Sequence, residues 1–180
     1  MKNQSSAEAA RHSLAHLLAA AVLEIYPDTL TTIGPAVENG FYYDFQFSET
    51  ISEKDLGAIE KRMKKLLPSW KEFTHKEVSQ EEAEEFFAKN PYKLELIKEI
   101  VASGEKITLY TVGEGKHAFT DLCRGGHTEN PAKDIDSDSF KLDRIAGAYW
   151  RGDEKNTMLT RIYGLAFPSA KELEEFINIR

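Results

Sequence analysis

Two histidines stand four residues apart near the start of the chain, in the segment Arg11-His12-Ser13-Leu14-Ala15-His16. On an α-helix this spacing places both imidazoles on one face. Imidazole exchanges protons near neutral pH and also binds metals, so the pair is suited to acid–base chemistry or to a metal site. Residues 13–23 contain no charged side chain, which argues against a solvent-facing helix. The pattern favours a functional cleft, with buried structural histidines as the alternative.

A second group of reactive side chains lies in Asp121-Leu122-Cys123-Arg124-Gly125-Gly126-His127. Cys123 is the single cysteine of the chain, so it forms no intrachain disulfide, and an unpaired cysteine is most often a small buried apolar residue. Combined with the histidine pair, it gives three imidazoles and a thiol, a set that zinc accepts. Four protein ligands would close the zinc shell, whereas a catalytic zinc keeps a position for water. Two interpretations stay open: a zinc site, or a metal-free set of acid–base groups.

Other catalytic motifs are missing from the sequence. There is no His-Glu-x-x-His, no phosphate-binding P-loop around Gly115-Lys116, and no Gly-x-Ser-x-Gly. These absences argue against a serine nucleophile and against nucleotide hydrolysis. The basic run at 61–65 is interpreted as a solvated helix face, and His75 as a surface residue.

The elements that must position these groups alternate without a βαβ order. Apolar residues at three- and four-residue steps predict a helix over 7–26, ended by Pro27. Strands are predicted over 31–37 and 41–47, joined by a tight turn in which Asn39-Gly40 supplies positive φ angles. Further helices are predicted over 52–67, 79–87, 92–102 and 169–177, and further strands over 70–78, 107–112, 117–120, 140–150 and 157–167. The mixture predicts an α+β fold, with a mixed or antiparallel sheet and packed helices.

Composition limits the class of protein. The chain has 180 residues and a net charge of −7, and this acidity argues against a module that reads nucleic-acid sequence. Contact with one end of an RNA stays compatible with it. No apolar run approaches the ~20 residues of a membrane span, and the first residues lack the hydrophobic stretch of a secretory signal. We expect one domain in a soluble, cytoplasmic protein without a membrane partner.

Five ordered motifs together resemble the editing domain of bacterial-type threonyl-tRNA synthetase, which is related to the editing domain of alanyl-tRNA synthetase. One departure is Gly126, where many threonyl enzymes have proline. The resemblance covers the chain from about Arg11 to its end. It rests on Arg11-His12-Ser13-Leu14-Ala15-His16, Ile33-Gly34-Pro35, Asn39-Gly40-Phe41-Tyr42-Tyr43-Asp44, the segment 121–127, and Ala146-Gly147-Ala148-Tyr149-Trp150-Arg151-Gly152-Asp153.

The resemblance implies hydrolysis of seryl-tRNA(Thr), the ester formed when the synthetase activates serine by mistake. It implies a single editing domain over 1–180, with 1–10 as an N-terminal extension and without the aminoacylation and anticodon domains. The chain is then a fragment of a synthetase, whose missing domain would use ATP, or a free-standing deacylase. The implied partners are the 3′ aminoacylated end of tRNA(Thr) and, for a fragment, the other synthetase domains.

The resemblance also implies roles for individual residues. His12 and Lys93 position or deprotonate the attacking water, Lys93 being the lysine of the pair Tyr92-Lys93. Asp121 binds the ammonium group of the serine. The implied catalytic residues are His12, Lys93, His16 and His127, and the implied substrate-binding residues are Asp121, Cys123, Gly34 and Tyr43.

The resemblance also bears on whether the site binds zinc. Threonyl editing domains are regarded as metal-independent, whereas alanyl relatives bind zinc through the residues matching His12, His16, Cys123 and His127. We therefore expect no required cofactor, with zinc at these four ligands as the alternative. Two other functions compete with seryl-tRNA(Thr) hydrolysis: a zinc-stabilised tRNA-docking module without hydrolysis, and a deacylase of the alanyl type.

Overall fold

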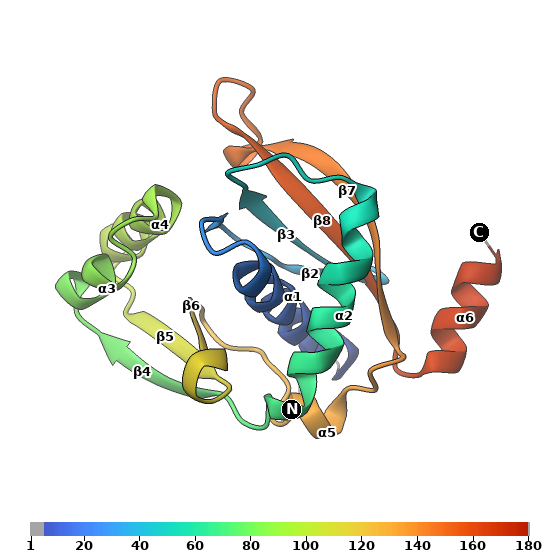
Figure 1. Cartoon of the computed structure of the whole chain (residues 1–180). Helices are drawn as coiled ribbons and strands as arrows, with labels where there is room; N and C mark the ends of the chain where they lie inside the picture. The colour runs from blue at the N-terminus through green and yellow to red at the C-terminus, as the bar shows by residue number, and fades with distance from the viewer. Residues whose placement is uncertain (1–5, 180) are drawn as a thin grey trace.

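Two antiparallel sheets and six α-helices make up residues 6–179, the part of the chain that the computed structural model describes (Figure 1). The larger sheet has the order β1-β3-β8-β7, with β2 also paired to β3, and the smaller sheet has the order β4-β5-β6. This arrangement confirms the predicted α+β class. The strands are β1 (Leu30–Thr31), β2 (Ala36–Val37), β3 (Gly40–Gln46), β4 (Thr74–Val78), β5 (Ile107–Val112), β6 (Phe119–Leu122), β7 (Phe140–Tyr149) and β8 (Met158–Ala166). The helices are α1 (Ser6–Ile25), α2 (Leu56–Leu66), α3 (Gln80–Phe86), α4 (Pro91–Ala102), α5 (Pro131–Asp134) and α6 (Ala170–Ile179).

Helix α1 lies between the two sheets (Figure 1). Every residue from 13 to 22 is buried, which explains why this stretch carries no charge. The helix begins at Ser6, so part of the N-terminal extension expected over 1–10 is helical, and residues 1–5 of it lie outside the described residues. A helix covered on both sides can present its histidines to a cleft rather than to solvent.

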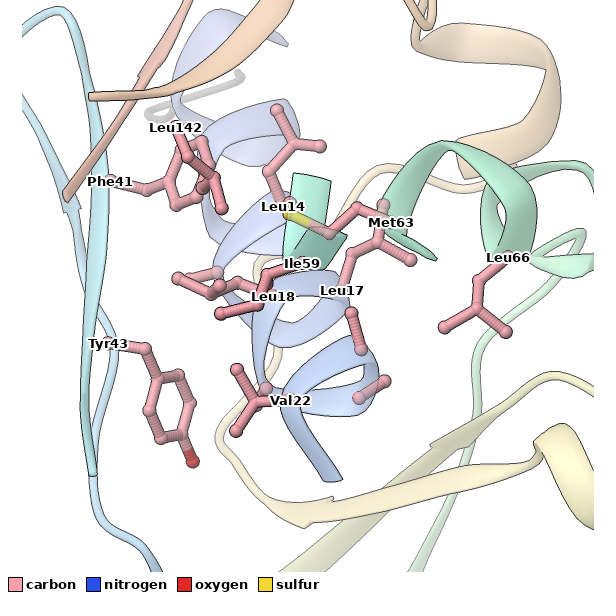
Figure 2. Close-up of a cluster of buried hydrophobic side chains, with 14 of the residues drawn as sticks. Leu14, Leu17, Leu18, Val22, Phe41, Tyr43, Ile59, Met63, Leu66 and Leu142 are labelled. Atoms are coloured by element: carbon pink, nitrogen blue, oxygen red, sulfur yellow. The ribbon is translucent and has the colours of Figure 1, made fainter. Parts of the chain in front are cut away.

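The main core is formed where α1 packs against β3 and α2. Figure 2 shows leucines of α1 between Phe41 and Tyr43 of β3 on one side and Met63 and Leu66 of α2 on the other. Phe41 and Tyr43 are two residues apart, so both side chains lie on the inner face of the strand. Full burial of each such side chain contributes about 1.5–3 kcal/mol. The hydroxyl of Tyr43 points away from the packed leucines and places a polar group at the end of the core (Figure 2).

The β2–β3 hairpin is confirmed, but the role predicted for Gly40 in its turn is wrong. Val37 pairs with Gly40, so Glu38 and Asn39 are the two turn residues, and Asn39 alone has the left-handed φ of 65°. Gly40 is instead the first residue of β3. A Cβ there would lie 1.8 Å from the carbonyl oxygen of Gly164 on β8. The glycine is therefore needed for close contact between neighbouring strands.

The strand predicted over 31–37 is divided into two short strands, and this is the second correction. Residues 32–35 form an irregular segment that still bonds to β3, since Thr32 donates its N–H to the Asp44 carbonyl and Asp44 donates its own to Ile33. Pro35 has no N–H to continue a ladder. The irregular segment leaves the Thr32 carbonyl free of strand pairing.

The smaller sheet carries α3 and α4 on one side. Their shared core consists of Ala83, Phe87, Ile97, Ile107 and Leu109. Ser79 caps α3 as the sequence predicts, because its Oγ accepts from the N–H of Glu82 while the Glu82 carboxylate accepts from Ser79.

The strand predicted from Trp70 begins only at Thr74. The indole of Trp70 is fully buried in the main core and its ring stacks on Phe119 with centroids 6.0 Å apart. Packing of this large side chain overrides the alternation that suggested a longer strand.

Helix α5 was not predicted, although Asn130-Pro131 begins it with the same cap that Asn90-Pro91 gives to α4. Among the described residues, no helix is long and apolar enough to cross a membrane.

Candidate active site

A cavity of about 550 Å³ opens between the two sheets. One wall comes from α1 and the irregular segment 32–35, and the other comes from α4, β5 and the loop after β6. Its polar lining includes His12, His16, Lys93, Asp121 and Cys123. Residues from four separate stretches of sequence therefore meet in one space.

The two predicted reactive segments are brought together at one end of this cavity. Nε2 of His12 lies 3.2 Å from Nε2 of His16 and 3.6 Å from Sγ of Cys123. Sγ of Cys123 lies 3.3 Å from Nε2 of His127, and the rings of His12 and His127 are stacked with centroids 4.4 Å apart. The three imidazoles and the thiol form one contiguous cluster.

Asp121 joins this cluster to Lys93. Its Oδ1 accepts from Nζ of Lys93 at 2.6 Å and from the N–H of Leu122 at 2.8 Å. Its Oδ2 accepts from the hydroxyl of Tyr43 at 2.9 Å and lies 3.2 Å from Nδ1 of His16. Asp121 is 3 % exposed and Lys93 is 1 % exposed, so the ion pair is almost dehydrated. A buried pair of this kind needs several hydrogen bonds to be tolerated, and here both partners have them.

Lys93 is held from three sides. Besides the carboxylate, Nζ donates to the Thr32 carbonyl at 2.7 Å and lies 3.3 Å from the Tyr43 hydroxyl. Asn90 caps the first turn of α4 by accepting from the N–H groups of Tyr92 and Lys93. The side chain of Asn90 also donates to the Thr31 carbonyl at 2.8 Å. The start of α4 is therefore tied to the larger sheet.

The charged groups in the cluster shift the pKa values of their neighbours. Burial alone raises the pKa of the Cys123 thiol, but hydrogen bonds from His12, His127 and His16 outweigh it and lower that pKa to about 4. Burial lowers the pKa of His16, yet Asp121 and Cys123 overcompensate and raise it to about 9. Burial raises the pKa of Asp121, but the charges of Lys93 and His16 and the hydrogen bonds from both together lower it below the ordinary value, so the carboxyl stays ionised. The cluster thus contains both anionic and cationic groups beside an open cavity.

Of the two predicted pocket residues Gly34 and Tyr43, Gly34 lines the cavity, whereas Tyr43 lies behind it in the main core. A Cβ on Gly34 would lie 2.2 Å from the ring of Tyr43. Tyr43 is fully buried, and burial together with the charge of Asp121 raises the pKa of its hydroxyl well above the ordinary value. The phenol is therefore a hydrogen-bond donor to Asp121, and Gly34 makes room for it.

Gly125 and Gly126 shape the loop between Cys123 and His127. Their φ angles are 101° and 92°, in the region that favours glycine. Proline fixes φ near −65°, so a proline at 126 could not adopt this conformation. His127 is oriented by Phe73, whose ring stacks on the imidazole with centroids 4.0 Å apart.

Sequence reasoning missed two groups that hold the site. The Thr32 carbonyl bonds to Lys93, and Phe73 stacks on His127. A backbone carbonyl has no residue signature, and Phe73 lies in the segment that was predicted to be strand. The Asn-Pro pair at 90–91, in contrast, is visible in the sequence as a helix start.

The donor set of the cluster fits a zinc ion. The ligand atoms of His12, His16, Cys123 and His127 all lie within 4.8 Å of one another. Zinc with bonds of about 2.0–2.3 Å holds its ligands roughly 3.3–3.8 Å apart in a tetrahedron, close to the contacts found here. The carboxylate of Asp121 beside Nδ1 of His16 is the outer partner that zinc-bound histidines have.

Comparison with known proteins shows which proteins this chain is similar to. The family model described as "Threonyl and Alanyl tRNA synthetase second additional domain" matches residues 107–163, which include Asp121, Cys123 and His127. A threonine-tRNA ligase of Borreliella burgdorferi (strain ZS7) is 48% identical over 170 residues, which cover 94% of this chain and 28% of that protein.

A threonine-tRNA ligase of Francisella philomiragia is 47% identical over 180 residues, covering 99% of this chain and 27% of that protein. The corresponding enzyme of Borrelia hermsii is 46% identical over 170 residues. The chain thus spans little more than a quarter of the length of the relatives it matches. Residues 107–163 thus match the threonyl and alanyl tRNA synthetase second additional domain, and nearly the whole chain matches the editing region of the threonine-tRNA ligases.

Proposed function

We propose that this chain hydrolyses the ester bond of seryl-tRNA(Thr). The observation that carries the proposal is the convergence of Lys93, Asp121, His12, His16 and Cys123 on one cavity, with His127 in contact with Cys123 outside the cavity lining. Similarity to one region of threonine-tRNA ligases supplies the substrate class. We treat residues 1–180 as one editing domain, acting in the cytoplasm within a synthetase or as a separate deacylase.

The need for such an activity follows from the size of serine. Serine lacks one methyl group relative to threonine, a difference worth only about 1–3 kcal/mol in a binding pocket. A synthetase that must discriminate more strongly between serine and threonine needs a second site where the mischarged product is hydrolysed. The aminoacylation and anticodon domains, and the ATP that the former would use, belong to the remainder of such a synthetase.

The reaction requires a water molecule to attack the carbonyl carbon of the ester. The C–O bond to the terminal ribose breaks, serine leaves as its carboxylate, and a proton reaches the ribose oxygen. His12 reaches into the cavity and can accept the proton of the water, since general bases have to lie within hydrogen-bond distance of the nucleophile. Lys93 is a donor held in fixed position, suited to orienting the water or the developing oxyanion.

Asp121 has two tasks in this proposal. It fixes Lys93 and His16, which it already contacts, and its negative charge attracts the ammonium group of the serine. His16 and Cys123 line the cavity and donate to or accept from the ribose hydroxyls, while His127 acts through its contact with Cys123. Gly34 lines the wall beside the amino acid, and Tyr43 is buried behind it. His16 and Asp121 are buried, so their electrostatic contacts act at a lower dielectric than in bulk water.

A zinc ion would be held by His12, His16, Cys123 and His127, which would close its tetrahedral shell, and it would supply Lewis-acid chemistry only if one coordination position were open to an oxygen. Our expectation is that hydrolysis does not require it. The same cluster supports the second candidate function, a zinc-stabilised module that docks the tRNA end without hydrolysis. In that case removal of zinc would unfold the chain.

The test follows ester loss with purified protein and three substrates: seryl-tRNA(Thr), threonyl-tRNA(Thr) and seryl-tRNA(Ala), each with and without a chelator. Selective and chelator-resistant loss of the seryl ester on tRNA(Thr) is the expected result. Faster loss from seryl-tRNA(Ala) would assign the chain to the alanyl type of deacylase. Stoichiometric zinc with no ester loss would favour the docking module.

A further inference from the structure

The connection between β7 and β8 contacts helix α4 through Trp150 and Arg151, neither of which lines the cavity. Trp150–Gly152 forms a single 3-10 turn in which Arg151 has φ 59° and ψ 22°. A non-glycine residue in this left-handed region is unusual and is kept there by its contacts. Nε of Arg151 donates to Oε2 of Glu95, and its NH2 group lies 2.5 Å from Oε2 of Glu99. Glu95 and Glu99 are one helical turn apart, so a single guanidinium spans one face of α4.

Trp150 supports the same face of the helix. Its Nε1 donates to Oε2 of Glu95 at 3.2 Å, and the guanidinium of Arg151 lies over its ring at 5.0 Å. The ring of Trp150 also meets the ring of Tyr92 edge to face, with centroids 5.0 Å apart. The indole is 6 % exposed and shares a small core with Leu159 of β8. The turn therefore joins the larger sheet to α4 by packing as well as by charge.

Lys93 lies between these contact points along the helix. Tyr92 precedes it and Glu95 follows it, while its own side chain points to the other side, toward Asp121. Leu96, Glu99 and Ile100 of the same helix line the cavity. A movement of α4 away from the larger sheet would therefore shift Lys93 and this cavity wall together.

We propose that Arg151 and Trp150 are positioning residues for Lys93. They hold α4 at the distance from the larger sheet at which Nζ reaches the Thr32 carbonyl and Asp121 together. The inference rests on the proposed function for its kinetic consequence, but the placement of Lys93 can be measured without substrate. Neither residue touches the reacting atoms, and both act through the helix.

The kinetic test uses Arg151→Gly, because glycine adopts the left-handed backbone without strain while the two ion pairs and the contact of the guanidinium with the Trp150 ring are lost. Trp150→Phe is the second variant, which keeps a ring against Tyr92 and removes the Nε1 donor. Arg62→Ala is the matched control, since Arg62 forms a partly exposed ion pair with Glu24 outside the cavity lining. Single-turnover rates on seryl-tRNA(Thr) are measured at saturation and below it. The release of Glu99 at the cavity rim alters KM, whereas displacement of Lys93 lowers the saturated rate.

We expect the saturated rate of Arg151→Gly to fall about tenfold or more, because a misplacement of about 1 Å can cost roughly a hundredfold. The saturated rate of Trp150→Phe should fall less, and Arg62→Ala should keep the wild-type rate. The rate is compared well below the melting temperature of each variant, so loss of folded protein does not contribute. An unchanged saturated rate in Arg151→Gly would overturn the proposal.

The substrate-free test observes the side-chain ammonium of Lys93 by NMR after 15N labelling of lysine, with Lys93→Met to assign the signal. A buried, hydrogen-bonded ammonium exchanges slowly with water and gives a separate signal. In Arg151→Gly this signal is expected to shift and to exchange faster, and in Arg62→Ala it is expected to stay. A Lys93 signal identical in wild type and Arg151→Gly would refute the positioning role. If the wild-type chain shows no hydrolysis, the proposed function fails, and the NMR result still decides the positioning role.

Discussion

Nζ of Lys93 lies 2.6 Å from Oδ1 of Asp121, and both side chains are withdrawn from solvent between the two sheets. Lys93 comes from α4 and Asp121 from β6, so the pair joins the helix to the strand that leads into Cys123 and His127. A dehydrated ion pair contributes less to stability than its distance suggests, because removing two charges from water is costly. Both residues line the cavity, where the proposed function gives them their roles.

Removal of Lys93 alone should damage both activity and stability. Lys93→Ala leaves the Asp121 carboxylate buried without its cation, which costs about 3–5 kcal/mol. Urea unfolding measures this loss, and hydrolysis of seryl-tRNA(Thr) should disappear. The double variant Lys93→Met with Asp121→Asn is expected to recover much of the stability and none of the activity. Equal stability of the single variant and wild type would show that the pair is not buried in solution.

Removal of His12 should separate activity from stability. His12 is partly exposed, and the Cys123 thiolate keeps its hydrogen bonds to His127 and His16 when His12 is removed, so His12→Ala should cost less free energy of unfolding than Lys93→Ala. Loss of a general base typically lowers a rate by about 10²–10⁴-fold. The matched control is His75→Ala, because His75 is exposed on β4 outside the cavity lining. Similar rates for His12→Ala and His75→Ala would remove His12 from the mechanism.

Gly34 and Gly57 give a matched pair of substitutions to alanine. The Cβ of Gly34→Ala would lie 2.2 Å from the Tyr43 ring and 2.7 Å from the Tyr42 carbonyl, whereas the Cβ of Gly57→Ala meets nothing within 4 Å. Overpacking at Gly34 should destabilise the chain by about 1–3 kcal/mol. Gly57 lies in α2, where alanine should stabilise it by roughly 0.5–1 kcal/mol. Thermal unfolding of both variants checks the opposite signs, and a stabilised Gly34→Ala would contradict the close contact.

A chelator should leave the rate of hydrolysis unchanged. In a separate measurement without chelator, the chain should still bind zinc. A zinc-selective dye measures affinity for wild type and for Cys123→Ser, and the latter should bind more weakly because a hydroxyl is a poorer zinc ligand than a thiolate. Binding of zinc to the folded chain should raise its melting temperature by mass action. A rate that falls with chelator and returns with zinc would replace the metal-free mechanism by a zinc-dependent one.

Helical spacing made part of the site readable in the sequence. His12 and His16 are four residues apart on a helix without charge from 13 to 23, and they do share one face beside the cavity. The pair Asn90-Pro91 shows where α4 starts, and the glycines at 125 and 126 mark a loop with positive φ. These features are local, because they depend on the period of a helix or on the conformations that one residue allows.

Packing decided what the local pattern could not. Burial of Trp70 shortens the strand that was predicted from it, and the irregular segment at 32–35 turns the Thr32 carbonyl toward Lys93. Arg151 meets Glu95 across 56 residues of sequence, with no periodicity to predict the contact.

The sequence by itself determined the α+β class and most of the helices and strands, since these follow from residue type and spacing, and it identified His12, His16, Cys123 and His127 as candidate reactive side chains. Only the tertiary structure decided that Lys93 and Asp121 form a buried pair and that the β7–β8 turn holds α4. The physical reason is that contacts between distant segments depend on how two sheets pack around α1. That packing minimises exposed apolar surface over the whole chain rather than over any one segment.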